Sequence, residues 1–148
     1  MGTSGVFIGF DYGHRHIGVA VGQKLTGTAT ALQTINSKDG APDWKQVSAL
    51  LDEWQPEGLV VGIPYHLDGS PSDTSRAAEE FARQLERHYR LPVYRQDERL
   101  TSREAESVAA QRRSSGRVAR NKLDTDKLAA QIILQNWIDR RKENKYGR

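Results

Sequence analysis

Three acidic residues, far apart in the sequence, are the candidates for catalysis. Asp11 closes the first apolar run of the chain, and Glu98 closes a later strand-like segment over residues 92–98. Asp126 begins the apolar face of the last helix-like segment. A carboxylate in an apolar setting is strongly disfavoured, so each acid needs something that offsets its charge. A metal ion is one candidate. The alternative is that Asp11 only opens a turn together with Gly13, because Asp and Gly are common turn residues.

The last helix-like segment, residues 124–139, indicates where Asp126 points. At 3.6 residues per turn this acid shares one helical face with four apolar residues, namely Ala129, Ala130, Ile133 and Trp137. Asp126 therefore lies at the N-terminal end of the face that packs on the sheet. The two alanines let the helix approach the sheet closely. The alternative is that Asp126 only offsets the positive end of the helix dipole.

Asp11 and Glu98 both end strands, and parallel strands end at the same edge of a sheet. Three acids that converge there repel one another unless a divalent cation neutralises them, and an oxygen-only ligand set suits Mg²⁺ or Mn²⁺. Two such ions about 4 Å apart support hydrolysis of phosphodiester bonds. A histidine metal site is the rival interpretation, although the spacing of the candidate ligands matches no zinc signature: His14, His16 and His66.

Hydrophobic patterning predicts an α/β fold with a five-stranded mixed sheet flanked by helices. Alternating and fully apolar runs indicate three antiparallel strands followed by two parallel ones, over residues 5–11, 17–22, 28–35, 58–63 and 92–98. Helical spacing indicates helices over 42–54, 72–90 and 124–139, and Thr101 can cap a further helix.

Length and composition limit the class of protein. The chain has 148 residues, and we expect one domain over residues 1–140 followed by a polar tail over 141–148. The absence of cysteine excludes disulfides and thiolate metal sites. No apolar run approaches the roughly 18 residues of a membrane span, and the first residues lack a secretory pattern. We therefore expect a cytoplasmic protein that does not associate with membranes.

Basic residues are candidates for contact with nucleic acid. The formal net charge is only +3, but residues 111–122 hold a concentrated group of cations around Ser114, Ser115 and Gly116. This segment is either a basic loop that contacts phosphates or an ordinary solvated linker. From charge and loop position we expect phosphate contacts from six residues: Arg15, Arg76, Arg112, Arg113, Arg117 and Lys122.

Four motifs, in the same order along the chain, resemble those of the YqgF family. They are Gly9–Gly13 followed by Ile17–Ala20, Val60–Pro64 with Asp68–Gly69, Asp97–Thr101, and Asp126–Ala130 with Ile133–Gln135. Members of this family are bacterial nucleases with an RNase H-like fold, also called Holliday-junction-resolvase-like proteins. The resemblance implies that Asp11, Glu98 and Asp126 are the catalytic acids. The chain departs from the family pattern at His14, His16 and His66, which concerns substrate contacts more than the acids.

The resemblance implies a divalent-metal nuclease that trims the 5′ end of precursor 16S ribosomal RNA during ribosome biogenesis. Resolution of four-way DNA junctions is the alternative activity, and a non-catalytic nucleic-acid-binding factor in ribosome assembly is the alternative class. An actin-like ATPase also begins with an Asp-x-Gly hairpin, but it needs two such domains and this chain has length for one. We expect a monomer or a weak homodimer that binds structured RNA or branched DNA.

Overall fold

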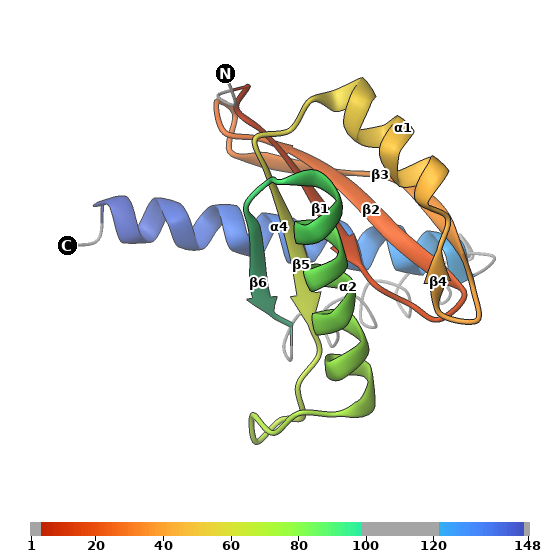
Figure 1. The fold of residues 1–148 in the computed structure, drawn as a ribbon. Coiled ribbons are helices and arrows are strands. Elements are labelled where there is room, and N and C mark those ends of the chain that lie inside the picture. Colours follow the sequence, from red (N-terminus) through yellow and green to blue (C-terminus); the bar gives the residue numbers. More distant parts are fainter. Residues whose placement is uncertain (1–3, 99–121, 147–148) are drawn as a thin grey trace, which may run out of the picture.

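The computed structural model describes residues 4–98 and 122–146, with side chains over 4–98 and 126–142. One mixed sheet has the strand order β4-β3-β2-β1-β5-β6 (Figure 1). Its strands are β1 (Val6–Asp11), β2 (His16–Gln23), β3 (Thr28–Lys38), β4 (Ala41–Pro42), β5 (Gly58–Ile63) and β6 (Val93–Asp97). The helices are α1 (Trp44–Trp54), α2 (Asp73–Tyr89) and α4 (Lys122–Tyr146). The predicted α/β fold with a mixed, helix-flanked sheet is confirmed.

Within the described residues the sheet has six strands, where the sequence predicted five. The additional strand, β4, has two residues and pairs with the end of β3 through Ser37 and Lys38. Its Pro42 lies at the edge of the sheet, where a missing N–H group costs no ladder hydrogen bond. Because Pro42 belongs to this strand, the cap of α1 is the next residue, Asp43, which accepts hydrogen bonds from the N–H groups of Lys45 and Gln46. The helix begins at Trp44 instead of residue 42.

The last helix is longer than the predicted 124–139. α4 runs from Lys122 to Tyr146, so it takes in most of the segment expected to be a tail. The added part of the helix contacts the rest of the protein through the side chain of Arg141. The Arg141 guanidinium lies 4.7 Å from the centre of the Trp137 ring and 5.7 Å from that of Tyr94. The helix expected from Thr101 and almost all of the basic segment 111–122 lie outside the described residues.

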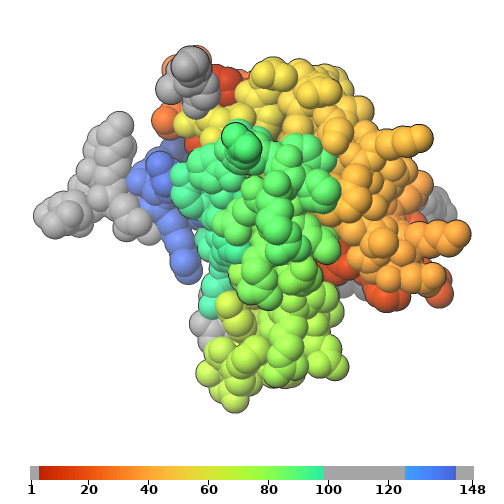
Figure 2. All heavy atoms as spheres, in the orientation of Figure 1, coloured from red at the N-terminus to blue at the C-terminus, as the bar shows by residue number. Residues whose placement is uncertain are grey.

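Hydrophobic cores lie on both faces of the sheet because side chains alternate along each strand. On β1, Ile8 and Phe10 pack under α1 and α2, whereas Phe7 packs under α4 and contacts Trp137 at a ring-centre distance of 4.8 Å. Figure 2 shows α1 and α2 covering the first of these faces. No helix among residues 4–98 and 122–146 has the length and hydropathy needed to cross a membrane.

Side chains of α4 also cover part of the open edge of the sheet. Gln135 accepts a hydrogen bond from the Ala29 N–H at 2.9 Å and donates one to the Gly27 carbonyl at 2.9 Å. Gln131 donates to the Ala29 carbonyl at 3.1 Å. Ala29 lies on β3, an outer strand at this point, so the two glutamines satisfy backbone groups that an edge strand leaves unpaired. They also fix the position of α4 across the sheet.

Candidate active site

The sheet topology places Asp11 and Glu98 at the same edge. β1 and β6 flank β5, and both pair with it in parallel. Asp11 is the last residue of β1, and Glu98 directly follows the last residue of β6. Strand alternation puts Asp11 on the same face as Phe7 and Gly9, which is the face covered by α4. The prediction that these two strands end together is confirmed.

Gly62 on β5 makes room for the Glu98 side chain. A Cβ at Gly62 would lie 2.7 Å from Glu98 Oε2 and 2.5 Å from Ile133 Cδ1 on α4. The Glu98 carboxylate therefore lies over the main chain of the strand that separates β1 from β6. The Glu98 N–H donates to the Ile63 carbonyl at 3.2 Å, which holds the residue against the end of β5.

Glu98 is a buried acid whose pKa is affected by neighbouring acids. Only 3 % of its surface is exposed. Burial is the main cause that raises the pKa of Glu98 to about 9, and the nearby negative charges of Asp11 and Asp97 raise it further. An acid with such a pKa is held in an environment that favours its neutral form, and a bound cation would reverse that preference.

Asp126 reaches the same face from α4. Its carbonyl oxygen lies 2.0 Å from the point where a Cβ of Gly18 would stand, so only glycine lets the helix main chain approach β2 this closely. Gly18 pairs directly with Asp11 across β1 and β2. The predicted helical face is confirmed, since Ala129, Ala130, Ile133 and Trp137 are all buried.

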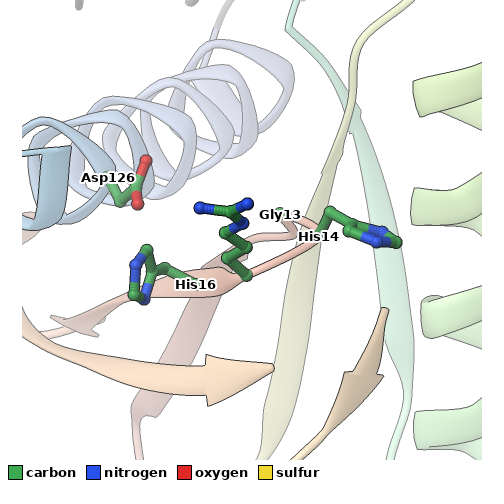
Figure 3. Close-up of a pocket in the computed structure, with 5 residues that line it drawn as sticks. Gly13, His14, His16 and Asp126 are labelled. Atoms are coloured by element: carbon green, nitrogen blue, oxygen red, sulfur yellow. The ribbon is translucent and has the colours of Figure 1, made fainter. Parts of the chain in front are cut away.

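A cavity of about 410 Å³ lies between the first part of α4 and the turn that joins β1 to β2. Among the described residues, five line it: Gly13, His14, Arg15, His16 and Asp126. In Figure 3, Asp126 extends from the helix and His16 from the strand on the same side of the turn, whereas His14 points away from Asp126. Asp126 thus lines this cavity, while its main chain lies over Gly18, the residue that pairs with Asp11.

The acid donors fit a hard divalent cation in their chemistry. Asp11 and Glu98 supply carboxylate oxygens, and their mutual repulsion is what a cation would relieve. Within residues 4–98 and 126–142, no three His, Asp or Glu side chains are gathered closely enough to hold a metal. The structure does not support the alternative metal site of His14, His16 and His66. His14 points away from Asp126, and His66 lies in the loop between β5 and α2.

The structure places two of the six candidate phosphate contacts and the backbone of a third. Arg15 lines the cavity. Arg76, near the start of α2, forms an exposed ion pair with Asp73 at 3.2 Å, which is weak and leaves its charge accessible. Lys122 is the first residue of α4, although its side chain lies outside the described part. The others also fall outside it: Arg112, Arg113 and Arg117.

Gly18 is one of the glycines whose lack of a side chain permits close packing or close approach by a ligand, whereas the role of Gly62 was missed from the sequence. Both lie inside apolar strands, where a glycine can signal either a weak strand or a close approach of another backbone. The first admits the α4 main chain and the second admits the Glu98 carboxylate. The signal available was the interruption of an otherwise β-branched run, Val60 and Val61 followed by Gly62.

The fold is that of RNase H-like resolvases. A solved structure of Thermus thermophilus RuvC in complex with a Holliday junction substrate matches with a TM-score of 0.52 at 19% identity, over 93% of this chain and 95% of that one. The fowlpox virus Holliday junction resolvase matches with a TM-score of 0.55 at 12% identity, over 91% and 99%. At these identities the likeness concerns the fold.

The chain belongs to the family described as "RuvX: Holliday junction resolvase", whose model matches residues 5–140. A relative from Pseudomonas fluorescens (strain SBW25), named "Putative pre-16S rRNA nuclease", is 47% identical over 136 residues, which cover 90% of this chain and 92% of the relative. A relative of the same name from Pseudomonas savastanoi pv. phaseolicola is 44% identical over 138 residues, covering 93% and 94%. RuvX is the same family as YqgF, so the resemblance that the four sequence motifs indicated is confirmed.

Proposed function

We propose that this protein is a divalent-metal-dependent nuclease that hydrolyses phosphodiester bonds. The observation that carries the proposal is the juxtaposition of Asp11 with the buried Glu98 at one edge of the sheet, under α4. Burial and the nearby charge of the half-buried Asp11 both raise the pKa of Glu98, which is costly for folding alone, and such perturbed groups concentrate at functional sites. Asp126, from the helix that covers the same face, is the third acid of the proposed site.

The proposed site uses each acid in a different way. Asp11 lies between the other two along the sheet and is the central metal ligand. Glu98 supplies a ligand whose position is fixed by burial, and Asp126 closes the site from the helix. Mg²⁺, or Mn²⁺ in its place, supplies Lewis-acid stabilisation and an activated water when bound. The protein's contribution is to hold oxygen donors in a partly dehydrated position.

The proposed substrate is structured RNA, and the proposed reaction is cleavage at the 5′ end of precursor 16S ribosomal RNA in the cytoplasm. The names of the relatives at 44–47% identity support this choice. Arg15 in the cavity beside Asp126 offers a cation for the sugar-phosphate backbone. A single nuclease domain over residues 1–140, acting as a monomer or weak dimer, is sufficient for such a substrate.

Resolution of four-way DNA junctions is the second candidate. The description of the family and the resolvase fold favour it. A junction is nearly two-fold symmetric, so its resolution requires a symmetric dimer that presents two sites. Sedimentation of the protein with and without a four-way junction tests this requirement, and a monomer on the junction speaks against the resolvase.

The deciding experiment compares both substrates in one assay. Purified protein is incubated with precursor 16S ribosomal RNA and with a four-way DNA junction, in Mg²⁺ and in EDTA. We expect Mg²⁺-dependent cleavage of the RNA and its loss in Asp11→Asn, which keeps the shape of the side chain. Asp52→Asn changes an exposed acid on α1 and is the matched control. Binding without any metal-dependent product would reject the nuclease in favour of a binding factor. Full activity of Asp11→Asn would reject the proposed acid site.

A further inference from the structure

The turn between β1 and β2 is held to the β3–β4 hairpin through three successive carbonyl groups. The Ser37 hydroxyl donates to the Gly13 carbonyl at 3.2 Å, and the Ser37 N–H donates to the Arg15 carbonyl at 2.8 Å. Between them, the Gly40 N–H donates to the His14 carbonyl at 3.1 Å. Turns of this kind are commonly mobile and solvated, whereas every carbonyl from residue 13 to residue 15 is engaged here.

The hairpin that holds this turn is itself fitted to it. The Tyr12 hydroxyl donates to the Gly40 carbonyl. Gly40 has a φ of 82°, a conformation that other residues adopt at a cost, and a Cβ there would lie 3.3 Å from both the Tyr12 hydroxyl and His14 Nδ1. Gly40 thus supplies a hydrogen-bond donor and an acceptor to the turn in a conformation suited to glycine. The turn is preorganised before any ligand arrives.

The preorganised turn presents polar side chains to the cavity beside Asp126. Arg15 brings a permanent positive charge with five N–H donors, and it is exposed at the cavity. His16 brings an imidazole whose Nδ1 atom is shielded from solvent and has no hydrogen-bond partner among the described residues. A shielded polar atom without a partner is costly. Rotation of the His16 ring toward the cavity would bring this atom within reach of a ligand, which can supply the missing hydrogen bond.

We propose that this cavity binds one nucleotide unit of the nucleic-acid strand, with its phosphate on Arg15 and its sugar edge on His16. The volume of about 410 Å³ lies in the range of small-molecule sites, and the pairing of a guanidinium with a phosphate is a strong charge-assisted contact. The proposal deepens the proposed nuclease function, because a nucleotide held here lies directly beside Asp126. Ser37 is then a positioning residue that acts through the turn.

The test uses uridine 5′-monophosphate as the probe, in EDTA, so that no cleavage chemistry is involved. The four histidines of the chain provide internal reporters, since His16 lines the cavity, whereas His88 on α2 contacts the Trp44 ring at a ring-centre distance of 4.3 Å. Imidazole resonances are followed by ¹H–¹⁵N NMR during titration. We expect a saturable shift of the His16 resonance and an unchanged His88. No shift at His16, equal shifts at both rings, or equal binding of uridine without its phosphate would overturn the proposal.

Variants separate the phosphate contact from the positioning of the turn. Arg15→Gln should weaken binding of the nucleotide about tenfold or more, as expected for loss of a charged hydrogen bond. Ser37→Ala should weaken it several-fold, Ser37→Thr should restore it, and Ser48→Ala should leave it unchanged because Ser48 bonds Tyr89 far from the turn. Failure of Thr to rescue, or an effect of Ser48→Ala as large as that of Ser37→Ala, would remove the positioning role.

The two proposals fail in different assays. Nucleotide binding is measured without metal, whereas cleavage is measured with Mg²⁺ and a full-length substrate. A protein that binds uridine 5′-monophosphate at His16 but never cleaves would keep the nucleotide site and lose the nuclease. A protein that cleaves, with KM unchanged in Arg15→Gln and no His16 shift, would keep the nuclease and lose the nucleotide site.

Discussion

Glu98 Oε2 lies 2.7 Å from the point where a Cβ of Gly62 would stand. The carboxylate of one strand end therefore occupies the volume that a side chain on the neighbouring strand would fill. Ile133 of α4 competes for the same volume at 2.5 Å. Any side chain at position 62 must displace either the acid or the helix.

Gly62→Ala should abolish most metal-dependent cleavage and lower the free energy of unfolding by about 1–3 kcal/mol, because an added methyl group in a packed site forces its neighbours to move. Gly58→Ala, on the same strand, is the control, since the nearest atoms to its Cβ would belong to the rings of Phe7 and Tyr94, at 3.0–3.2 Å, and not to an acid. Urea unfolding and the cleavage rate measure the two effects. Normal cleavage by Gly62→Ala would show that Glu98 need not stay over β5.

Glu98→Gln should stabilise the metal-free protein at alkaline pH. The pKa of Glu98 is raised to about 9 in the folded chain, so the folded state keeps a proton that the unfolded state loses above pH 4.5. Stability contributed by the protonated acid is therefore present below pH 4.5 and declines as the pH rises towards 9. Glutamine should remove this decline, by more than about 1 kcal/mol. Urea unfolding in EDTA at pH 5 and pH 8.5 tests it, and parallel pH dependences of the two proteins would contradict it.

Mg²⁺ should raise the melting temperature of the wild-type protein and not that of Asp11→Asn. A cation that binds only the folded state stabilises it in proportion to the logarithm of its concentration above Kd. Differential scanning fluorimetry across a Mg²⁺ series measures the shift, with Asp52→Asn as the control. An equal shift in all three proteins would locate the effect outside the acid site.

Arg95→Gln should loosen the contact between β6 and α2. Arg95 donates to Glu79 and Glu86, at 2.8 Å to each, and holds the strand that leads to Glu98 against the helix. Hydrogen bonding from Arg95 is the main cause that lowers the pKa of Glu86, so this stabilisation is present at neutral pH and is lost as the pH falls through that lowered pKa. We expect a loss of about 1 kcal/mol at pH 7 and low salt. Arg87→Gln, which removes only an exposed pair with Glu80, should cost less in the same unfolding assay.

Gln135→Ala should expose the edge of β3 near Ala29. We expect a loss of about 1 kcal/mol from two broken hydrogen bonds, and faster aggregation on heating because an unpaired strand edge can pair with another chain. Light scattering during a thermal ramp measures the second effect. Arg140→Ala, on an exposed part of α4, serves as the control, and equal scattering by both variants would argue against the edge-covering role.

The sequence predicted the parts of the site that depend on local periodicity. The apolar run into Asp11 and the helical spacing from Asp126 were sufficient to place both acids on strand and helix faces, because burial sets those periods. The prediction that β1 and β6 end at the same edge of the sheet followed from their expected parallel orientation. The use of the three acids together on a metal stays a prediction.

Features that depend on contacts between distant segments were beyond such reasoning. The hydroxyl of Ser37 reaches the carbonyl of Gly13 across 24 positions, and Gln135 reaches Ala29 across 106. Neither residue belongs to a repeating pattern. The length of α4 was misjudged for the same reason, because Arg141 reads as a solvated cation until its contact with Trp137 is known.

The bracing of Gly13, His14 and Arg15 has a consequence for how a strand can enter. A turn whose carbonyl groups are all hydrogen-bonded cannot easily change its shape to fit an incoming polymer, so the polymer must bend instead. Unpaired or branched nucleic acid bends at little energetic cost, whereas a continuous duplex is stiff. If the proposed nucleotide site is correct, the rigidity of this short turn would favour substrates that are already pliable where they are cut.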